Sequence, residues 1–375
     1  MQKSSIQQLL PAWLSRIRPY PAGKPIEEVE RELGIKAIKL ASNENPMGPS
    51  PRAVEAIRQA ASRIHLYPDS AGRDLTETLA RRYGLEPNQI ILGAGSTELI
   101  ELAAKTFLSA GDEGISSEFA FHIYQIAIQE TGATLTLVPT RDMALDLAAI
   151  RRAVTGRTRI IFLGNPNNPT GTMFSAREFD EFLGSLPAHV LAVLDEAYFD
   201  YVQRPDYSHS RDYALSGRNV LVLRTFSKVY GLAGMRLGYG FGPTPLIEAL
   251  NRVRMPFNTS RLAQAGAIAA LGDSEYVARS VEMNAREMRF VSQELTLLGL
   301  RFTPSAANFV LIDTARDCEE DFLRLLQEGV IVRPMKVYGL PTSLRVTIGT
   351  HEDNERFLEA LHRICAAAAP ERGCL

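Results

Sequence analysis

The sequence predicts an α/β fold: a mainly parallel sheet covered by helices, with a smaller α+β domain beside it. Between residues 89 and 223, short strands that are apolar throughout alternate with amphipathic helices, as in parallel sheets that are buried on both faces. From Phe257 onward, long helices and isolated strands replace this alternation. We therefore predict an N-terminal arm that contributes to the small domain (1–45), a large domain (46–256) and a small C-terminal domain (257–375).

The individual elements follow from apolar periodicity and from residues that cap helices. In the arm we predict a helix at 6–17 that Pro11 interrupts, a helix at 26–33 and a strand at 36–40. The large domain has predicted helices at 50–62, 74–83, 98–107, 146–154 and 175–183, and strands at 89–92, 134–138, 159–163, 190–194 and 219–223. Ser50 before Pro51, and Ser175 three residues before Glu178, are typical starts of helices. The small domain has predicted helices at 260–271 and 274–298, and strands at 308–312 and 343–348 with a short helix between them.

Composition excludes several classes of protein. The 375 residues are 45% hydrophobic and 22% charged, with a net charge of −2, so no basic field is present to attract nucleic acid or anionic lipid. No apolar run reaches the roughly 20 residues that span a bilayer, and the first residues do not resemble a secretory leader. Cys318, Cys365 and Cys374 are too few and too scattered to predict a disulfide framework or a metal cluster. We expect a cytoplasmic protein without a metal.

The segment 224–238, which follows the strand at 219–223, carries the clearest chemical signal. Lys228 lies just beyond the buried strand, where loss of water lowers the pKa of an amine and suits it to form a Schiff base. The hydroxyls of Thr225 and Ser227 and the guanidinium of Arg236 could together hold a phosphate. A lysine next to a phosphate site indicates a covalently bound, phosphorylated aldehyde cofactor. The alternative is a solvated lysine in a glycine-rich loop.

Two further clusters follow other strands, at the sheet edge where parallel sheets bind ligands. Ser96 and Thr97 directly precede the helix predicted at 98–107, and with the backbone amides at the start of that helix they could bind an anion; the alternative is an ordinary capped helix. Asn168 lies in the loop 165–171, in which two prolines and a glycine fix the chain and present the amide rigidly. The alternative for this loop is a tight turn without chemistry.

The last two clusters place charged residues next to, or within, apolar strands. Asp195 follows the strand at 190–194, where a buried acid needs a partner such as a cationic heterocyclic nitrogen, and Tyr198 could point at the same ring; the alternative for Asp195 is a helix N-cap. Arg345 lies inside the apolar strand at 343–348 and needs an anion, for which a substrate group is the favoured partner. Arg333 could add a second cation, or could form an internal salt bridge.

With these clusters in this order, the chain resembles the pyridoxal-phosphate-dependent aminotransferases of fold type I, from residue 18 to Arg345. The specific motifs are Asn-Asn-Pro-Thr-Gly at 167–171, Asp-Glu-Ala-Tyr at 195–198, Ser-Lys at 227–228 and Leu-Arg at 344–345. Within that family it is most similar to the histidinol-phosphate aminotransferases, through Pro-Tyr-Pro at 19–21, the segment 43–49 and Tyr-Pro-Asp at 67–69. These last three signals are shared with relatives that act on aromatic amino acids.

The resemblance implies a role for each matching residue. Lys228 would bind pyridoxal 5′-phosphate covalently and then transfer a proton, while Asp195 would pair with the pyridine nitrogen. Asn168 and Tyr198 would hydrogen-bond the ring oxygen, and Phe121 would stack on the ring without the phenol found in the family. The cofactor phosphate would be held by Ser96, Thr97, Thr225, Ser227 and Arg236. Tyr67 would reach the phosphate of the neighbouring subunit's cofactor, which implies a homodimer. Substrate would contact Tyr20, Asn43, Asn168, Arg333 and Arg345.

The activity that the resemblance implies is transfer of an amino group between small molecules, from histidinol phosphate to 2-oxoglutarate, in histidine biosynthesis. One alternative keeps the fold and the cofactor but acts on phenylalanine or tyrosine, or decarboxylates threonine phosphate. Another is a binding protein that has lost catalysis, although Lys228, Asp195 and Arg236 together argue against it. The sequence leaves open whether histidinol phosphate or an aromatic amino acid is preferred.

Overall fold

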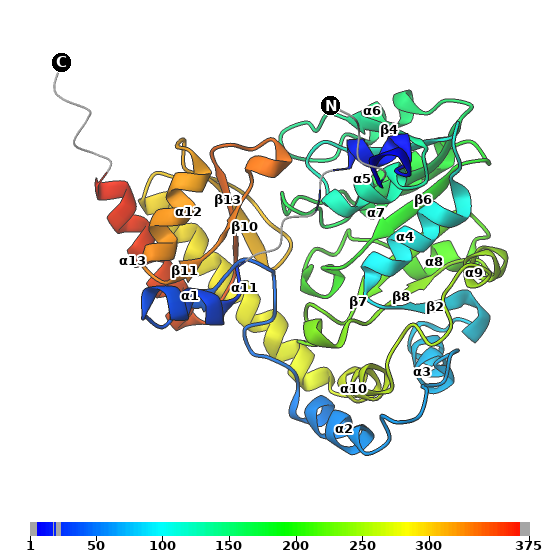
Figure 1. Ribbon diagram of the computed structural model, residues 1–375, viewed down its shortest axis with the longest axis horizontal. Helices are drawn as coiled ribbons and strands as arrows, with labels where there is room; N and C mark the ends of the chain where they lie inside the picture. Colours follow the sequence, from blue (N-terminus) through cyan, green and yellow to red (C-terminus); the bar gives the residue numbers. More distant parts are fainter. Residues whose placement is uncertain (1–5, 18, 20–23, 368–375) are drawn as a thin grey trace.

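A seven-stranded sheet forms the centre of the larger domain in the computed structural model, which describes residues 6–17, 19 and 24–367 (Figure 1). In spatial order its strands are β2 (Ile90–Gly93), β8 (Gly238–Phe241), β7 (Val220–Thr225), β6 (Leu191–Asp195), β5 (Thr158–Gly164), β3 (Glu113–Ser117) and β4 (Thr134–Val138). β8 runs antiparallel to both of its neighbours, and the other neighbouring pairs are parallel. The predicted mainly parallel sheet is therefore confirmed.

Helices cover both faces of this sheet because both faces of its central strands are apolar. One face carries α4 (Ser96–Phe107), α5 (His122–Gln129) and α9 (Thr244–Asn251). The other face carries α3 (Arg73–Tyr83), α6 (Leu147–Ala153), α7 (Ala176–Ser185), α8 (Ser210–Leu215) and α10 (Arg261–Leu271). α2 (Pro51–Ala61) packs on α10. Every residue of β6 and β7 is buried, as expected for strands in the middle of a covered sheet.

Helix capping follows the predicted patterns. The Ser50 hydroxyl accepts a hydrogen bond from the amide of Ala53 (3.2 Å) at the start of α2. At the start of α7, the Ser175 hydroxyl accepts from the amide of Glu178 (3.3 Å), and the Glu178 carboxylate accepts from the amide of Ser175 (2.7 Å). This reciprocal capping box satisfies donors that a helix start otherwise leaves unpaired.

The smaller domain contains a four-stranded antiparallel sheet within the described part of the chain. Its spatial order is β12 (Arg333–Pro334), β13 (Ser343–Thr347), β10 (Phe309–Asp313) and β9 (Arg301–Thr303). A second ladder joins β1 (Ile38–Lys39) from the N-terminal part to β11 (Val330–Ile331). The helices are α1 (Ile26–Leu33), α11 (Ser274–Leu297), α12 (Cys318–Gln327) and α13 (His351–Ala367).

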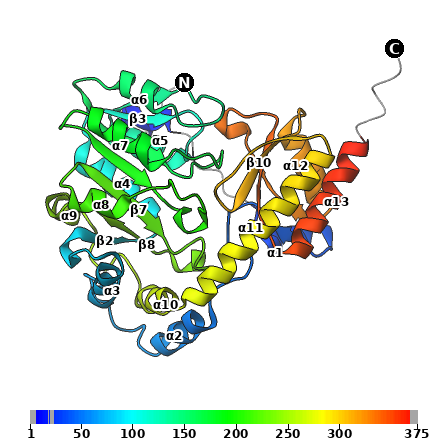
Figure 2. The ribbon, with the colours of Figure 1, turned by 180° about the vertical axis from the view of Figure 1, so that it is seen from behind.

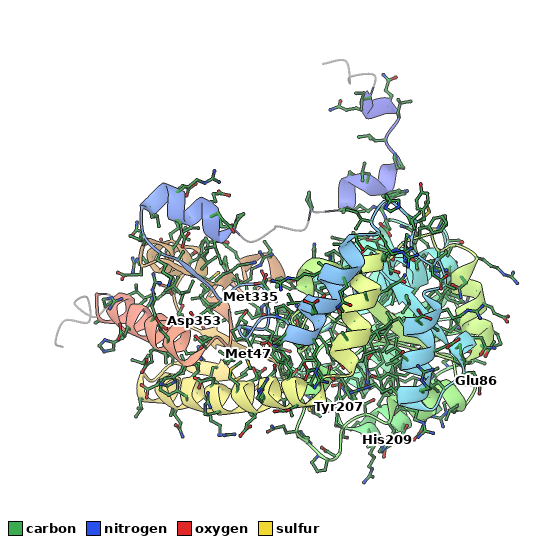
Figure 3. All side chains as sticks on the ribbon, turned by 90° about the horizontal axis from the view of Figure 1, so that it is seen from below. Met47, Glu86, Tyr207, His209, Met335 and Asp353 are labelled. Carbon is green, nitrogen blue, oxygen red and sulfur yellow. The ribbon has the colours of Figure 1, made fainter. Side chains whose placement is uncertain are left out.

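α11 connects the two domains. The helix runs from α10 to the small domain (Figure 2), where it packs against α13 and β9. In Figure 3, Met47 and Met335 lie where the domains meet, whereas Glu86 lies far out on the large domain. α10, which follows position 257, packs against α2 and α3 of the large domain. The predicted boundaries at 46 and 257 remain proposals.

The prediction of one interrupted helix at 6–17 is wrong. The chain forms two short 3₁₀ segments instead, Ile6–Gln8 and Ala12–Arg16. Pro11 lies between them, and a proline has no amide hydrogen to continue a helical ladder. Within the described residues, no helix is both long enough and apolar enough to cross a bilayer.

Candidate active site

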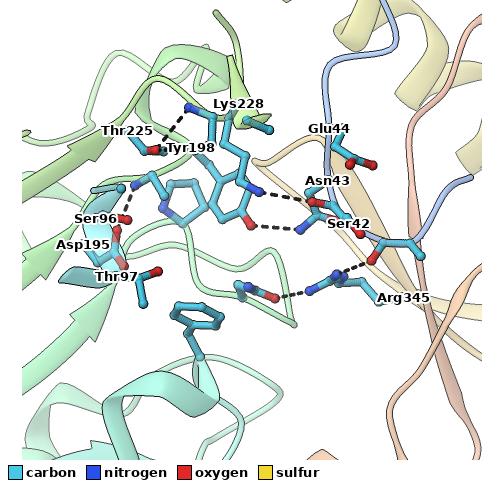
Figure 4. Close-up of a pocket in the computed structure, with 18 of the residues that line it drawn as sticks. Ser42, Asn43, Glu44, Ser96, Thr97, Asp195, Tyr198, Thr225, Lys228 and Arg345 are labelled. Carbon is cyan, nitrogen blue, oxygen red and sulfur yellow. Dashed lines mark hydrogen bonds between the residues drawn. The ribbon is translucent and has the colours of Figure 1, made fainter. Parts of the chain in front are cut away.

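A cavity of about 470 Å³ opens between the two domains, beyond the carboxyl ends of β5, β6 and β7 (Figure 4). It brings together nearly all of the predicted site residues, from both domains. Those that line it are Asn43, Ser96, Thr97, Phe121, Asn168, Asp195, Tyr198, Thr225, Ser227, Lys228, Arg236, Arg333 and Arg345. Of the remaining two, Tyr20 lies outside the described residues, and Tyr67 lies outside the cavity.

Lys228 extends into the cavity from the loop after β7. Its Nζ donates a hydrogen bond to the backbone oxygen of Ser42 (3.2 Å) and lies 5.6 Å from the centre of the Tyr198 ring. Burial, together with the positive charge of Arg345, lowers the pKa of Lys228 to about 8. A substantial share of the amine is therefore neutral near pH 8, and the neutral form is the nucleophile and proton acceptor.

Asp195 is the last residue of β6 and is only 5% exposed. Its Oδ2 accepts a hydrogen bond from the phenol of Tyr124 (2.8 Å), and its Oδ1 accepts from the amide of Ala197 (3.1 Å). Burial raises the pKa of Asp195 to about 6, although the hydrogen bond from Tyr124 acts in the opposite direction. The carboxylate is thus placed to pair with a cation that enters the cavity.

The start of α4 forms one end of the cavity. Gly95, with φ +81°, occupies the N-cap position and has no side chain to cap the helix, and it lines the cavity together with Ser96 and Thr97, the first two residues of the helix. Across from it, the hydroxyl of Thr225 donates to that of Ser227 (2.9 Å). A Cβ added at Gly95 would lie 2.7 Å from Nη2 of Arg236. Helix N-terminus, hydroxyls and guanidinium together suit a phosphate group.

The small domain supplies two arginines to the opposite side. Arg333 of β12 and Arg345 of β13 lie directly across from each other in the antiparallel ladder and are 7% and 4% exposed. Arg345 donates to Oδ1 of Asn168 (2.6 Å) and to the backbone oxygen of Ala41 (2.7 Å). Its Nε is buried and has no hydrogen-bond partner among the described residues. This donor and the two neighbouring positive charges favour an anionic ligand.

Asn43 connects the two sides of the cavity. It is buried and has a left-handed backbone conformation, φ +57°. Its side-chain amide donates to the Tyr198 phenol (2.8 Å), its side-chain oxygen accepts from the hydroxyl of Thr347 (3.1 Å), and its backbone oxygen accepts from Asn308 (3.1 Å). The geometry gives Asn43 a part in placing Tyr198, in addition to the predicted contact with substrate.

Comparison with known proteins identifies the family. Residues 35–361 match the family model of the class I and II aminotransferases. The chain belongs to this family.

The most similar relatives of this aminotransferase include two bacterial proteins. It is 49% identical to a histidinol-phosphate aminotransferase of Moorella thermoacetica, over 93% of this chain and 91% of the relative. It is 47% identical to histidinol-phosphate aminotransferase 2 of Pseudomonas fluorescens, over 95% of this chain and 97% of the relative. A crystal structure of histidinol-phosphate aminotransferase from Sinorhizobium meliloti, in complex with pyridoxal-5′-phosphate, superposes with a TM-score of 0.87 at 30% identity and covers 98% of both chains.

Of the two aromatic residues that were predicted to serve the cofactor through their position, Phe121 lies at the cavity and Tyr67 lies outside it. Phe121 precedes α5 and lines the cavity, with its ring edge-on to Tyr124 at 5.7 Å. Tyr67 is 77% exposed and stacks on Phe257 at 4.7 Å. A position on the surface agrees with the hypothesis that Tyr67 serves a second subunit.

The phenol of Tyr124 is among the groups at the site that sequence reasoning missed. No helix was predicted at 122–129, where the structure has α5. Tyr124 lies in the first turn of α5, three positions after Phe121, the N-cap residue of that helix, and the two rings are in contact. No cluster of three metal-binding side chains occurs among the residues that the structure describes.

Proposed function

We propose that this aminotransferase transfers the amino group of histidinol phosphate to 2-oxoglutarate in histidine biosynthesis, giving imidazole acetol phosphate and glutamate, with pyridoxal 5′-phosphate as cofactor. The observation that carries the choice of substrate is the pair Arg333 and Arg345. Both guanidinium groups line the cavity from adjacent strands, and both are nearly buried. Two such cations suit the double negative charge of a phosphate monoester better than the single charge of a carboxylate. The names of the similar relatives support the same substrate.

The residues at the cavity fit pyridoxal 5′-phosphate. The uncapped start of α4, with Thr225, Ser227 and Arg236, suits its phosphate. Asp195 lies buried against Tyr124 and suits a protonated ring nitrogen. When bound, the cofactor supplies an electron-withdrawing ring that stabilises negative charge at the substrate's Cα.

Lys228 performs the proton transfer in this proposal. Its lowered pKa makes a neutral amine available at Nζ near pH 8, both for covalent attachment to the cofactor aldehyde and, once released, for the proton at the substrate's Cα. The hydrogen bond to the backbone oxygen of Ser42 holds the amine in place. Since a charged amine cannot accept a proton, the reaction should slow as the pH falls below about 8.

Polar side chains on the other side of the cavity orient the reactants. Asn43 fixes the phenol of Tyr198, and Arg345 fixes the amide of Asn168 through its Oδ1. We assign Tyr198 and Asn168 to the ring oxygen of the cofactor. Arg345 and Arg333 would then bind the phosphate of histidinol phosphate in one half-reaction and a carboxylate of 2-oxoglutarate in the other. We expect Tyr20 to contact the substrate as well.

Half-reactions test the substrate directly. The holoenzyme is mixed separately with histidinol phosphate, histidinol, phenylalanine and tyrosine, and the loss of the cofactor's absorbance at the edge of the visible is followed by stopped flow. We expect histidinol phosphate to react fastest, and histidinol, which lacks the phosphate, to react about a hundredfold more slowly in kcat/KM. Faster reaction with the aromatic amino acids would refute the proposed substrate and would favour the aromatic alternative.

We further propose a cytoplasmic homodimer. Ile64 and Leu66, close to Tyr67 in the sequence, are exposed, and so is Phe257, which stacks on Tyr67. Exposed apolar side chains that gather on one surface are typical of a protein interface. Free thiols at Cys318 and Cys365 agree with a reducing compartment.

A further inference from the structure

A buried ion pair joins the ends of β6 and β7 behind the cavity. Glu196 directly follows Asp195, and Arg224 directly precedes Thr225. Oε2 of Glu196 lies 2.9 Å from Nη2 and 3.0 Å from Nε of Arg224. The two side chains are 0% and 5% exposed, respectively. Neither residue lines the cavity, and neither was predicted as a site residue.

The guanidinium of Arg224 also contacts three other segments. Its Nη1 donates to the phenol of Tyr83 (3.0 Å) at the end of α3, and its Nη2 donates to the hydroxyl of Ser210 (2.9 Å) at the start of α8. Its central carbon lies 3.3 Å from the centre of the Phe199 ring, and Phe199 follows the cavity residue Tyr198. One side chain thereby connects β7 to α3, to α8 and to the loop after β6.

Strand geometry explains how this pair affects the cavity without lining it. Asp195 lies across from Leu223 in the parallel ladder, and the amide of Glu196 donates to the backbone oxygen of Leu223 (2.8 Å). Successive side chains of a strand point to opposite faces. Asp195 and Thr225 therefore face the cavity, while the adjacent residues Glu196 and Arg224 face the other side of the sheet and meet there.

We propose that Glu196 and Arg224 are positioning residues for the cofactor site: their ion pair fixes the separation and orientation of Asp195, on β6, and of Thr225, Ser227 and Lys228, on β7 and its loop. The proposal rests on the proposed function, because those four residues are assigned to pyridoxal phosphate. A planar guanidinium that makes two contacts with one carboxylate and stacks on an aromatic ring holds one geometry. Lysine offers neither the plane nor the second contact.

The competing explanation is that the pair only stabilises the fold. Replacing a buried ion pair by apolar residues of similar size is often neutral for stability, whereas removing one partner leaves a buried charge. The double variant E196L/R224M therefore separates the two roles, because it removes the connection and leaves neither member of the pair behind as an unpaired charge. R224K keeps the positive charge and serves as a second variant if the double variant does not fold.

The control is a second ion pair that is remote from the cavity. Arg316 and Asp321 lie 3.0 Å apart in the small domain, with Asp321 1% exposed, and R316M/D321L removes that pair in the same way. For each protein we would measure thermal unfolding of the apoprotein, the Kd for pyridoxal phosphate, and the circular dichroism of the bound cofactor, which reports how the ring is oriented in the site.

We expect E196L/R224M, and R224K, to bind pyridoxal phosphate about tenfold to a hundredfold more weakly, with an altered cofactor dichroism. The control R316M/D321L should match wild type in both readings, and the melting temperature of E196L/R224M should fall no more than that of the control. Wild-type affinity and dichroism in both R224K and E196L/R224M would overturn the positioning role. If the wild-type protein binds no pyridoxal phosphate, the proposed function fails, and the positioning proposal fails with it.

Discussion

At the scale of single residues, the ionisation of Lys228 controls the proposed chemistry. Because the pKa of Lys228 is lowered to about 8, the neutral amine becomes scarce below that pH. We predict that the rate of covalent attachment of pyridoxal phosphate to the apoprotein rises about tenfold per pH unit below pH 8 and levels off above it. Absorbance after mixing, from pH 6 to 9.5, measures this rate. K228A should show no attachment, and a rate that still rises about tenfold per pH unit up to pH 9.5 would contradict the lowered pKa.

Tyr124 should set the acid side of the pH profile through Asp195. Its hydrogen bond stabilises the ionised carboxylate, so its removal in Y124F raises the pKa of Asp195 above about 6. The ionised form is then lost at a higher pH as the solution is acidified. Below the break that Lys228 sets near pH 8, loss of the Asp195 carboxylate sets a second, lower break in kcat/KM, and we predict that this lower break moves up by about one unit in Y124F. The control Y276F, which removes a hydrogen bond to the backbone of Met47, should leave the acid side of the profile unchanged. An unchanged acid side in Y124F would contradict the proposed effect of Tyr124 on Asp195.

Residue types and their distance from strand ends were sufficient to predict most of the site. Lys228, Asp195 and Asn168 each follow an apolar run, and the structure brings all three to one cavity. Partners across strands were not predictable in this way. Glu196 and Arg224 meet because of the register between β6 and β7, and a single sequence does not specify which strands are neighbours.

At the scale of elements, the start of α4 depends on a glycine. Gly95 has φ +81°, and a Cβ there would lie 2.7 Å from the Arg236 guanidinium. We predict that G95A weakens binding of pyridoxal phosphate by about tenfold or more, while pyridoxal, which lacks the phosphate, is affected less. Titration of the apoprotein measures both Kd values.

Gly184, a glycine inside a helix and away from the cavity, serves as the control for G95A. Gly184 lies within α7 with no atom near its added Cβ, so G184A should keep wild-type affinity and should gain about 0.5–1 kcal/mol in the free energy of unfolding. Equal weakening of pyridoxal and pyridoxal phosphate by G95A would show that α4 does not hold the phosphate.

Among the elements that were not predicted, the strands β3 and β8 lack the apolar run that marks a strand. β3 is Glu-Gly-Ile-Ser-Ser, a composition that does not read as a strand, yet it is wholly buried. Its Glu113 is satisfied there by the hydroxyl of Thr158 (2.8 Å), a partner distant in sequence. β8 is short and half glycine, so it lacks an apolar run. α13 was not predicted either, although its sequence does indicate a helix: Phe357, Leu361 and Ile364 recur at helical spacing, and all three are buried.

At the scale of the whole molecule, the proposed site needs two subunits. Tyr67 is exposed on its own chain and is assigned to the neighbouring site. We predict that Y67A and K228A are each nearly inactive, and that mixing and re-equilibrating them restores about one quarter of wild-type activity, since half of the dimers are mixed and one site in each is complete. No recovery, or an active monomer in sedimentation, would contradict the shared site.

The central claim is that the cavity between the domains binds pyridoxal phosphate covalently at Lys228. Reduction of the holoenzyme with borohydride fixes that bond, and digestion followed by mass spectrometry locates it. The account predicts one phosphopyridoxyl group per chain, on the peptide that contains Lys228. A label on another lysine, or no label after saturation with the cofactor, would contradict it.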